Sequence, residues 1–164
     1  MMQTNRRRFT LGGLTLAAAG VGGARLAAAA DAFEVTYSDE EWRRRLTSAQ
    51  YDVLRRHKTE RAGSSPLDRE KHAGTFHCAG CELALFSSTT KFDSGTGWPS
   101  FWKPLDGAVA TSQETFLFMT QTEVHCRRCG GHLGHVFEDG PKPTGLRYCM
   151  NGVAMIFRPS AAGA

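Results

Sequence analysis

The chain has 164 residues, of which 41% are hydrophobic and 22% charged, and its formal net charge is +4 at pH 7. This length fits a single domain. The four arginines of residues 1–30 account for the whole positive excess, so residues 31–164 carry 16 basic and 16 acidic side chains. A neutral domain does not indicate binding to nucleic acid or to an anionic membrane surface, and we expect neither a nucleic-acid partner nor stable membrane association.

Residues 1–30 have the composition of an export signal. Three arginines at positions 6–8 precede a weakly apolar Leu/Ala/Gly stretch, and an Ala-x-Ala site comes directly before Asp31. This pattern resembles a cleaved twin-arginine signal. An uncleaved membrane anchor is the alternative, but the apolar stretch before Arg25 is glycine-rich and shorter than the roughly 18 residues that a spanning helix needs. We therefore expect residues 31–164 to be a single domain exported to the periplasm.

Two short helices are predicted at the start of this domain. Residues 38–41, Ser-Asp-Glu-Glu, form a capping-box pattern that begins a helix, with Trp42 on its inner face. A second amphipathic helix is predicted over residues 48–58. Residues 61–74 are rich in Gly, Ser and charged residues and include a Pro, which indicates a loop.

The rest of the domain is predicted to be β-structure, because short β-branched or aromatic segments alternate with turn residues. The predicted strands are residues 74–77, 84–86, 109–111, 115–122, 133–137, 145–149 and 153–158. No internal repeat or second domain is visible. The sequence thus predicts a mainly β, antiparallel fold with a short helical N-terminal lead.

Four of the five cysteines form two Cys-x-x-Cys pairs, Cys78/Cys81 and Cys126/Cys129. Each pair has the spacing of a metal knuckle, and together they complete a closed tetrahedral site. We predict one structural zinc ion, which would join distant parts of the chain, and no organic cofactor. The sequence does not distinguish zinc from iron in this cage.

Two other interpretations of these pairs stay open. A redox-active Cys-x-x-Cys normally opens a helix, and the two glycines after Cys129 disfavour a helix there. A local metal site of Cys126, Cys129, His132 and His135 also has suitable spacing, but it would leave the first pair unexplained.

Cys149 is the one cysteine outside the pairs. If its segment is a strand, Arg147, Cys149 and Asn151 share one face, and the guanidinium favours the thiolate. An inert buried cysteine would instead have apolar neighbours. His132 and His135, separated by a Leu-Gly dipeptide, are candidate proton donors.

Trp98 lies in a glycine-rich loop directly before Pro99, which favours an extended conformation for the tryptophan. It is a candidate aromatic platform for an apolar or sulfur-bearing group. Its alternative role is to cap the core.

Four motifs, in this order along residues 38–157, together resemble the B-type methionine-R-sulfoxide reductases. They are Cys-Ala-Gly-Cys, Ser-Gly-Thr-Gly-Trp-Pro-Ser-Phe, Cys-Arg-Arg-Cys-Gly-Gly-His-Leu-Gly-His-Val-Phe and Gly-Leu-Arg-Tyr-Cys-Met-Asn. The resemblance implies a β-tent of two antiparallel sheets with zinc held by the paired cysteines. It also implies a thiol-dependent peptide-methionine (R)-S-oxide reductase, which repairs oxidised methionine in proteins or peptides. We expect a monomer.

The same resemblance implies a role for each residue of the site. Cys149 would attack the sulfoxide sulfur and become a sulfenic acid, and Trp98 would receive the substrate methyl group. Three residues would orient and protonate the departing oxygen: His132, His135 and Asn151. Two would complete the substrate pocket: Arg147 and Phe137.

The chain departs from many such relatives at Thr96, where they carry a resolving cysteine. With four cysteines assigned to the metal site, no second free thiol remains, so we expect an external thiol, thioredoxin-like or other, to reduce the sulfenic acid. Two rival functions remain: a zinc-stabilised binding module without catalysis, and an exported thiol-disulfide oxidoreductase, which would need a Cys-x-x-Cys that cycles.

Overall fold

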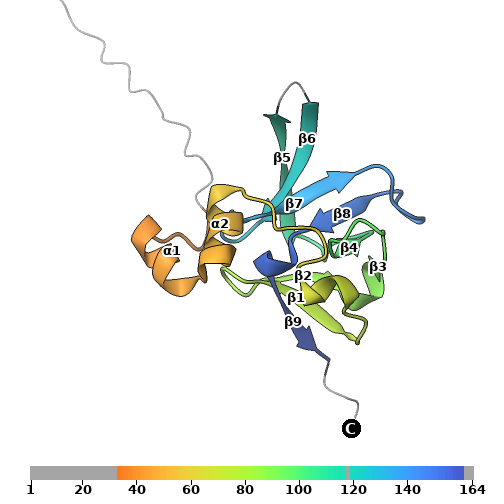
Figure 1. Ribbon diagram of the computed structural model, residues 1–164, viewed down its shortest axis with the longest axis horizontal. Coiled ribbons are helices and arrows are strands. Elements are labelled where there is room, and N and C mark those ends of the chain that lie inside the picture. Colours follow the sequence, from red (N-terminus) through yellow and green to blue (C-terminus); the bar gives the residue numbers. More distant parts are fainter. Residues whose placement is uncertain (1–32, 117–118, 161–164) are drawn as a thin grey trace, which may run out of the picture. The chain divides into compact units, whose positions relative to one another are not determined.

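A computed structural model describes residues 33–116 and 119–160, which form two short helices and two antiparallel sheets (Figure 1). This confirms the predicted fold class. The proposed export signal, residues 1–30, lies outside the described residues, so the boundary after residue 30 stays a prediction. No helix within the described ranges is long and apolar enough to cross a membrane.

The helices α1 (Asp39–Arg45) and α2 (Ser48–Arg56) begin at side-chain caps. Ser38 accepts the Glu41 backbone N–H as predicted, but the complete, reciprocal capping box belongs to α2, between Thr47 and Gln50. Glu41 instead forms ion pairs with arginines of its own helix. The N-terminus of α1 thus has the hydrogen bond from the Glu41 backbone to the Ser38 side chain but not the reciprocal one.

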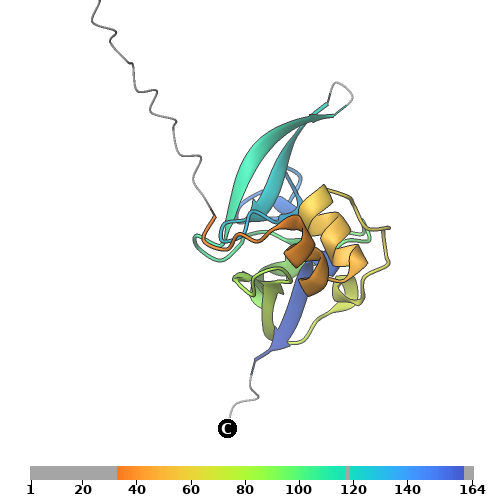
Figure 2. The same cartoon turned by 90° about the vertical axis from the view of Figure 1, so that its left-hand side faces the viewer.

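Helix α2 ends two residues earlier than predicted. His57 is its C-cap and adopts the left-handed conformation, with φ of 53°, which stops the helix and turns the chain. The helix packs on the strand β7 (His132–Phe137) and on the short 3-10 helix η3 (Gly152–Ala154), and it lies beside α1 (Figure 2). Leu54 is fully buried in this contact region.

The strands form two antiparallel sheets. The three-stranded sheet has the order β2-β1-β9, with β1 (Gly74–Cys78), β2 (Ala84–Ser87) and β9 (Met155–Pro159). The six-stranded sheet has the order β3-β4-β8-β7-β6-β5, with β3 (Lys91–Phe92), β4 (Ser100–Phe101), β5 (Val109–Phe116), β6 (Met119–Cys126), β7 (His132–Phe137) and β8 (Arg147–Met150). Three 3-10 helices lie between them: η1 (Pro66–Arg69), η2 (Ser88–Thr90) and η3 (Gly152–Ala154).

One strand prediction was wrong. The strand expected over residues 115–122 spans the connection between β5 and β6, which pair as a hairpin in which Phe116 lies opposite Met119. This segment contains no Gly, Pro, Asn or Asp, so no turn residue marks the reversal. The two-residue strands β3 and β4 were not predicted at all.

The core lies between the two sheets. Phe101 of β4 stacks on Phe86 of β2 with ring centroids 4.3 Å apart and meets Phe76 of β1 edge-on at 4.9 Å. All three side chains are fully buried. Burial of aromatic side chains of this size stabilises the contact between the two sheets.

Candidate functional site

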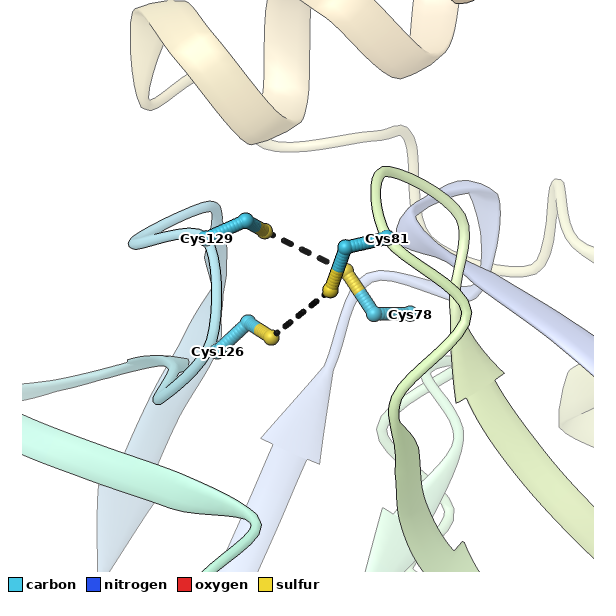
Figure 3. A group of neighbouring side chains, drawn as sticks. All are labelled: Cys78, Cys81, Cys126 and Cys129. Atoms are coloured by element: carbon cyan, nitrogen blue, oxygen red, sulfur yellow. Dashed lines mark hydrogen bonds between the residues drawn. The ribbon is translucent and has the colours of Figure 1, made fainter. Parts of the chain in front are cut away.

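The four paired cysteines converge on one point, although they come from different sheets (Figure 3). Cys78 ends β1 and Cys126 ends β6, and the turn after each strand brings back Cys81 and Cys129. The Sγ atoms of Cys78 and Cys129 are 3.7 Å apart, and those of Cys81 and Cys126 are 3.5 Å apart. The cluster therefore links the three-stranded sheet to the six-stranded sheet.

These distances suit a metal site. Four sulfurs bound tetrahedrally to zinc at about 2.3 Å lie about 3.8 Å from one another, whereas a disulfide needs about 2.05 Å. The neighbouring thiols, that of Cys129 first, hydrogen-bond to Cys126 and lower its pKa, which favours a thiolate in the cluster. The group could thus hold a metal ion. His132 and His135 face glutamates elsewhere, which does not favour the local alternative of two cysteines and two histidines.

Cys149 lies apart from this cluster, near the end of β8 and between two strands. It is directly opposite Ser100 on β4 and His135 on β7, so these side chains share a face of the sheet. The Thr96 hydroxyl lies 3.8 Å from the Cys149 sulfur. The thiol is half-buried and can be reached from solvent.

A β-bulge in β7 brings the two predicted histidines together. His132 and His135 are three residues apart and would point to opposite faces of a regular strand. Val124 pairs with Gly134 while His125 pairs with His132, so Leu133 is an extra residue that resets the alternation. The two imidazole rings consequently lie 5.3 Å apart.

The bulge also needs the glycine next to it. A Cβ atom at Gly134 would lie 2.2 Å from the Cys149 carbonyl oxygen, so only glycine allows β7 to approach β8 this closely. The sequence marks His132 and His135 as candidate proton donors but does not show how they come together. The extra residue responsible is visible only in the strand register.

Each histidine is held by a glutamate that sequence analysis did not identify. Glu123, which is buried, lies 2.8 Å from the Nδ1 atom of His132, and Glu114 lies 3.3 Å from the Nε2 atom of His135. The Nε2 atom of His132 is buried without a hydrogen-bond partner among the described residues. A buried nitrogen of this kind is available to a bound ligand. The alternation of residues in β6 could have placed Glu123 on the inner face.

Asn151 has both ends of its amide engaged. Its Oδ1 atom accepts the backbone N–H of Glu60 at 2.9 Å, and its Nδ2 atom donates to the Leu133 carbonyl at 3.0 Å. No other acceptor among the described residues binds Nδ2, so its second hydrogen is available to a ligand. Glu60 also binds Trp98, because the indole N–H of Trp98 donates to the Glu60 carbonyl at 3.2 Å.

Glu60 therefore organises two predicted site residues through its backbone. Its carboxylate also accepts the N–H groups of Gly152 and Val153, at 2.6 and 3.0 Å, directly after Asn151. Burial raises the pKa of Glu60 despite these hydrogen bonds. No sequence pattern marks this glutamate, which lies between the predicted second helix and the predicted loop.

Arg147 and Phe137 are in contact, because they are directly opposite on β8 and β7. The guanidinium lies 4.5 Å from the centre of the Phe137 ring and binds Asp139 through two hydrogen bonds of 2.8 Å. The bond to Asp139 is the main cause that raises the Arg147 pKa, and the nearby Cys149 adds to it. Asp139, in the loop after β7, is thus the principal partner of this cation, and no sequence pattern singled it out.

Known proteins share this chain's sequence over most of its length. The profile of the SelR domain matches residues 46–159. A peptide methionine sulfoxide reductase MsrB of Agrobacterium fabrum is 50% identical over 127 residues, which cover 77% of this chain and 94% of that protein. An MsrB of Pseudomonas putida is 54% identical over 73% of this chain and 91% of its own length. The chloroplastic peptide methionine sulfoxide reductase B1 of Oryza sativa is 48% identical over 75% of this chain.

The matched region contains both cysteine pairs, the tryptophan loop, the two histidines and Cys149. The four motifs identified from the sequence thus lie inside one family domain, on the fold described above. The chain belongs to the SelR domain family, the family of the MsrB peptide methionine sulfoxide reductases.

Proposed function

We propose that this protein reduces methionine-R-sulfoxide in peptides and proteins to methionine, with Cys149 as the nucleophile. The observation that carries the proposal is the register of β7 and β8, which sets Cys149 opposite His135, with the bulge bringing His132 beside it. A thiol and two imidazoles in one place supply the nucleophile and the acid that reduction of a sulfoxide needs.

The proposed reaction transfers the sulfoxide oxygen to the enzyme. The Cys149 thiolate attacks the substrate sulfur, the S–O bond breaks, and the oxygen and its proton finish on Cys149 as a sulfenic acid. Methionine leaves in its reduced form. The departing oxygen must be protonated as the bond breaks. We assign this step to His135 and to His132, whose Nε2 atom has no hydrogen-bond partner in the described part of the chain.

The remaining residues bind and orient the substrate. Trp98 would contact the methyl group on the sulfur, and the free Nδ2 hydrogen of Asn151 would hold the oxygen. Arg147 and Phe137, stacked on each other, would form a further wall of the pocket. Glu60 supports this assignment because it fixes both the indole N–H and the Asn151 amide.

Recycling of the enzyme would depend on a thiol from outside the chain. Cys149 faces Thr96 where a resolving cysteine would stand, and the other four cysteines form the cluster. One external thiol would release water and form a mixed disulfide with Cys149, and a second would free the enzyme. Without a thiol, one equivalent of substrate should yield one methionine and a sulfenic acid that mass spectrometry detects after dimedone labelling. An internal disulfide between Cys149 and a cluster cysteine would contradict this.

The substrate assignment is tested by the two epimers of a methionine sulfoxide peptide, with dithiothreitol as reductant. We expect turnover of the R epimer and at least about a hundredfold lower kcat/KM for the S epimer, since the acid and the nucleophile occupy fixed sides of the sulfur. Equal rates for the two epimers would contradict the proposal.

Two further assignments complete the proposed function. The four-cysteine cluster would hold one zinc ion with a structural role, supported by its closed set of thiol ligands and its sulfur separations. Residues 1–30 would direct export to the periplasm, supported by their arginines and their Ala-x-Ala site. Oxidised periplasmic proteins would then be the substrates.

A further inference from the structure

A second cluster of metal-binding side chains lies beside the proposed active site. Four of the six histidines gather around Glu123 and Glu114 on β5, β6, β7 and the end of α2. The Oε1 atom of Glu123 is 2.8 Å from His132 Nδ1 and 3.3 Å from His57 Nδ1. The rings of His57 and His132 stack with centroids 4.9 Å apart, so both present Nδ1 to the same oxygen.

The charges around these carboxylates leave room for a cation. Among the residues that the structure describes, every ion-pair partner of Glu114 and Glu123 is a histidine, and neither glutamate pairs with lysine or arginine. Glu123 is also buried. A metal ion would therefore supply a permanent positive charge that no lysine or arginine of the described residues supplies to this carboxylate.

We propose that His57, Glu123 and His132 bind a divalent transition-metal ion of the zinc class, at a site separate from the cysteine cluster. One ligand atom from each residue lies within 4.8 Å of the other two. Ligands in tetrahedral zinc sites are about 3.3 to 3.5 Å apart. The 3.3 Å separation already matches this range, and the 2.8 Å contact has to open by about 0.5 Å.

The donor set matches the proposed ion. Two imidazole nitrogens and one carboxylate are ligands that zinc, nickel and copper bind readily. Glu114 could supply a fourth ligand, because its Oε1 atom lies 3.2 Å from His57 Nδ1. Access is open from one side: the His57 side chain is 51% exposed, whereas those of Glu123 and His132 are 6% and 2% exposed. His57 would thus close over an ion held by two buried ligands.

Binding would inhibit the enzyme, and this consequence rests on the proposed function. The ion would replace the hydrogen bond between Glu123 and His132 and keep the imidazole from carrying a second proton. As a metal ligand, His132 could not form the imidazolium and would be a much weaker acid toward the departing oxygen. The site would make sulfoxide reduction sensitive to free zinc.

Isothermal titration with ZnCl₂ tests the site in protein that already carries one metal ion per chain. His57→Ala removes the exposed ligand, and His72→Ala is the matched control, because His72 is also exposed and pairs with a glutamate elsewhere. We expect one further zinc ion to bind to the wild type and to His72→Ala, and to bind at least about tenfold more weakly to His57→Ala. The absence of a second equivalent in the wild type, or equal binding to His57→Ala, would overturn the site and leave an ion-pair network.

A second measurement separates the site from the proposed function. Zinc at the concentration that fills the second site should inhibit sulfoxide reduction by the wild type and by His72→Ala, and inhibit His57→Ala much less. If the second ion binds through His57 but the protein reduces no sulfoxide, the metal site stands and the proposed function fails. If all three proteins are inhibited equally, inhibition does not arise from this site and the inferred link to His132 is wrong.

Discussion

The chain uses cysteine in two regions that differ in what surrounds the sulfur. In the cluster, four thiols from two sheets face one another, and three of them are buried. In the proposed active site, the Cys149 sulfur has a hydroxyl, an imidazole strand partner and a nearby guanidinium, and it is half-buried. Thiols that surround one point favour a metal ion, whereas a lone thiol among proton donors and a cation favours nucleophilic chemistry.

The two regions also differ in how they depend on the fold. The cluster connects the sheets, because Cys78 ends β1 and Cys126 ends β6. Cys149 lies within the six-stranded sheet and joins no distant segments by itself. Loss of a cluster cysteine should therefore act on stability, and loss of Cys149 should act on the reaction.

Cys149→Ser should have the largest effect on turnover. A serine hydroxyl stays protonated at neutral pH and is a poor nucleophile, so we expect kcat to fall by at least about a thousandfold. Metal content and melting temperature should stay at wild-type values, since Cys149 contributes no ligand to the cluster. Activity with a methionine-R-sulfoxide peptide, metal analysis and thermal unfolding measure the three quantities. Retained turnover would favour a binding module without catalysis.

Cys126→Ser removes one thiol as well, but from the cluster. We expect loss of the bound metal ion and a melting temperature lower by more than about 10 °C, because binding energy of a structural metal contributes directly to folding. Cys149→Ser is the matched control for removal of a thiol. Wild-type stability and metal content in Cys126→Ser would show that the cluster does not stabilise the fold. At a temperature low enough for Cys126→Ser to stay folded, its kcat should equal that of the wild type. A lower kcat in the folded variant would indicate that the cluster also takes part in the reaction.

Local patterns were sufficient to predict the parts of both regions that lie close together in the sequence. The spacing of the cysteines indicated the cluster that the structure shows. The role of the remaining cysteine, Cys149, as the nucleophile stays a prediction. Short strands such as β1 and β9 were predicted within one or two residues because β-branched and aromatic residues mark them. Trp42 was correctly placed on the buried face of α1.

Contacts between distant segments could not be predicted in this way. Glu60 meets Asn151 across 91 residues, and Asp139 meets Arg147 around a turn, yet neither contact has a local periodic signal. The extra residue Leu133 in β7 follows from pairing with β6, which no single segment reveals. Such residues position the side chains of the proposed site, and they can be identified only from the packed fold.

Glu60→Gln gives the finest test of the comparison, because it changes the support of the active site without removing a cysteine or a proposed catalytic group. The carboxylate accepts two backbone N–H groups, whereas a glutamine oxygen can accept one and its NH₂ group would face the other donor. We expect Asn151 and Trp98 to shift by a fraction of an ångström and kcat/KM to fall about 10- to 100-fold.

The matched control is Glu70→Gln, because the Glu70 carboxylate also accepts a backbone N–H, from His72, but among the described residues it forms no hydrogen bond with Asn151, Trp98 or η3. Its kcat/KM should equal that of the wild type. Metal content should be unchanged in both variants. A Glu60→Gln protein that loses melting temperature but keeps kcat/KM would show that Glu60 stabilises η3 only. A fall in kcat/KM with the metal still bound would show that the active site, unlike the cysteine cluster, depends on a carboxylate that the reaction itself does not use.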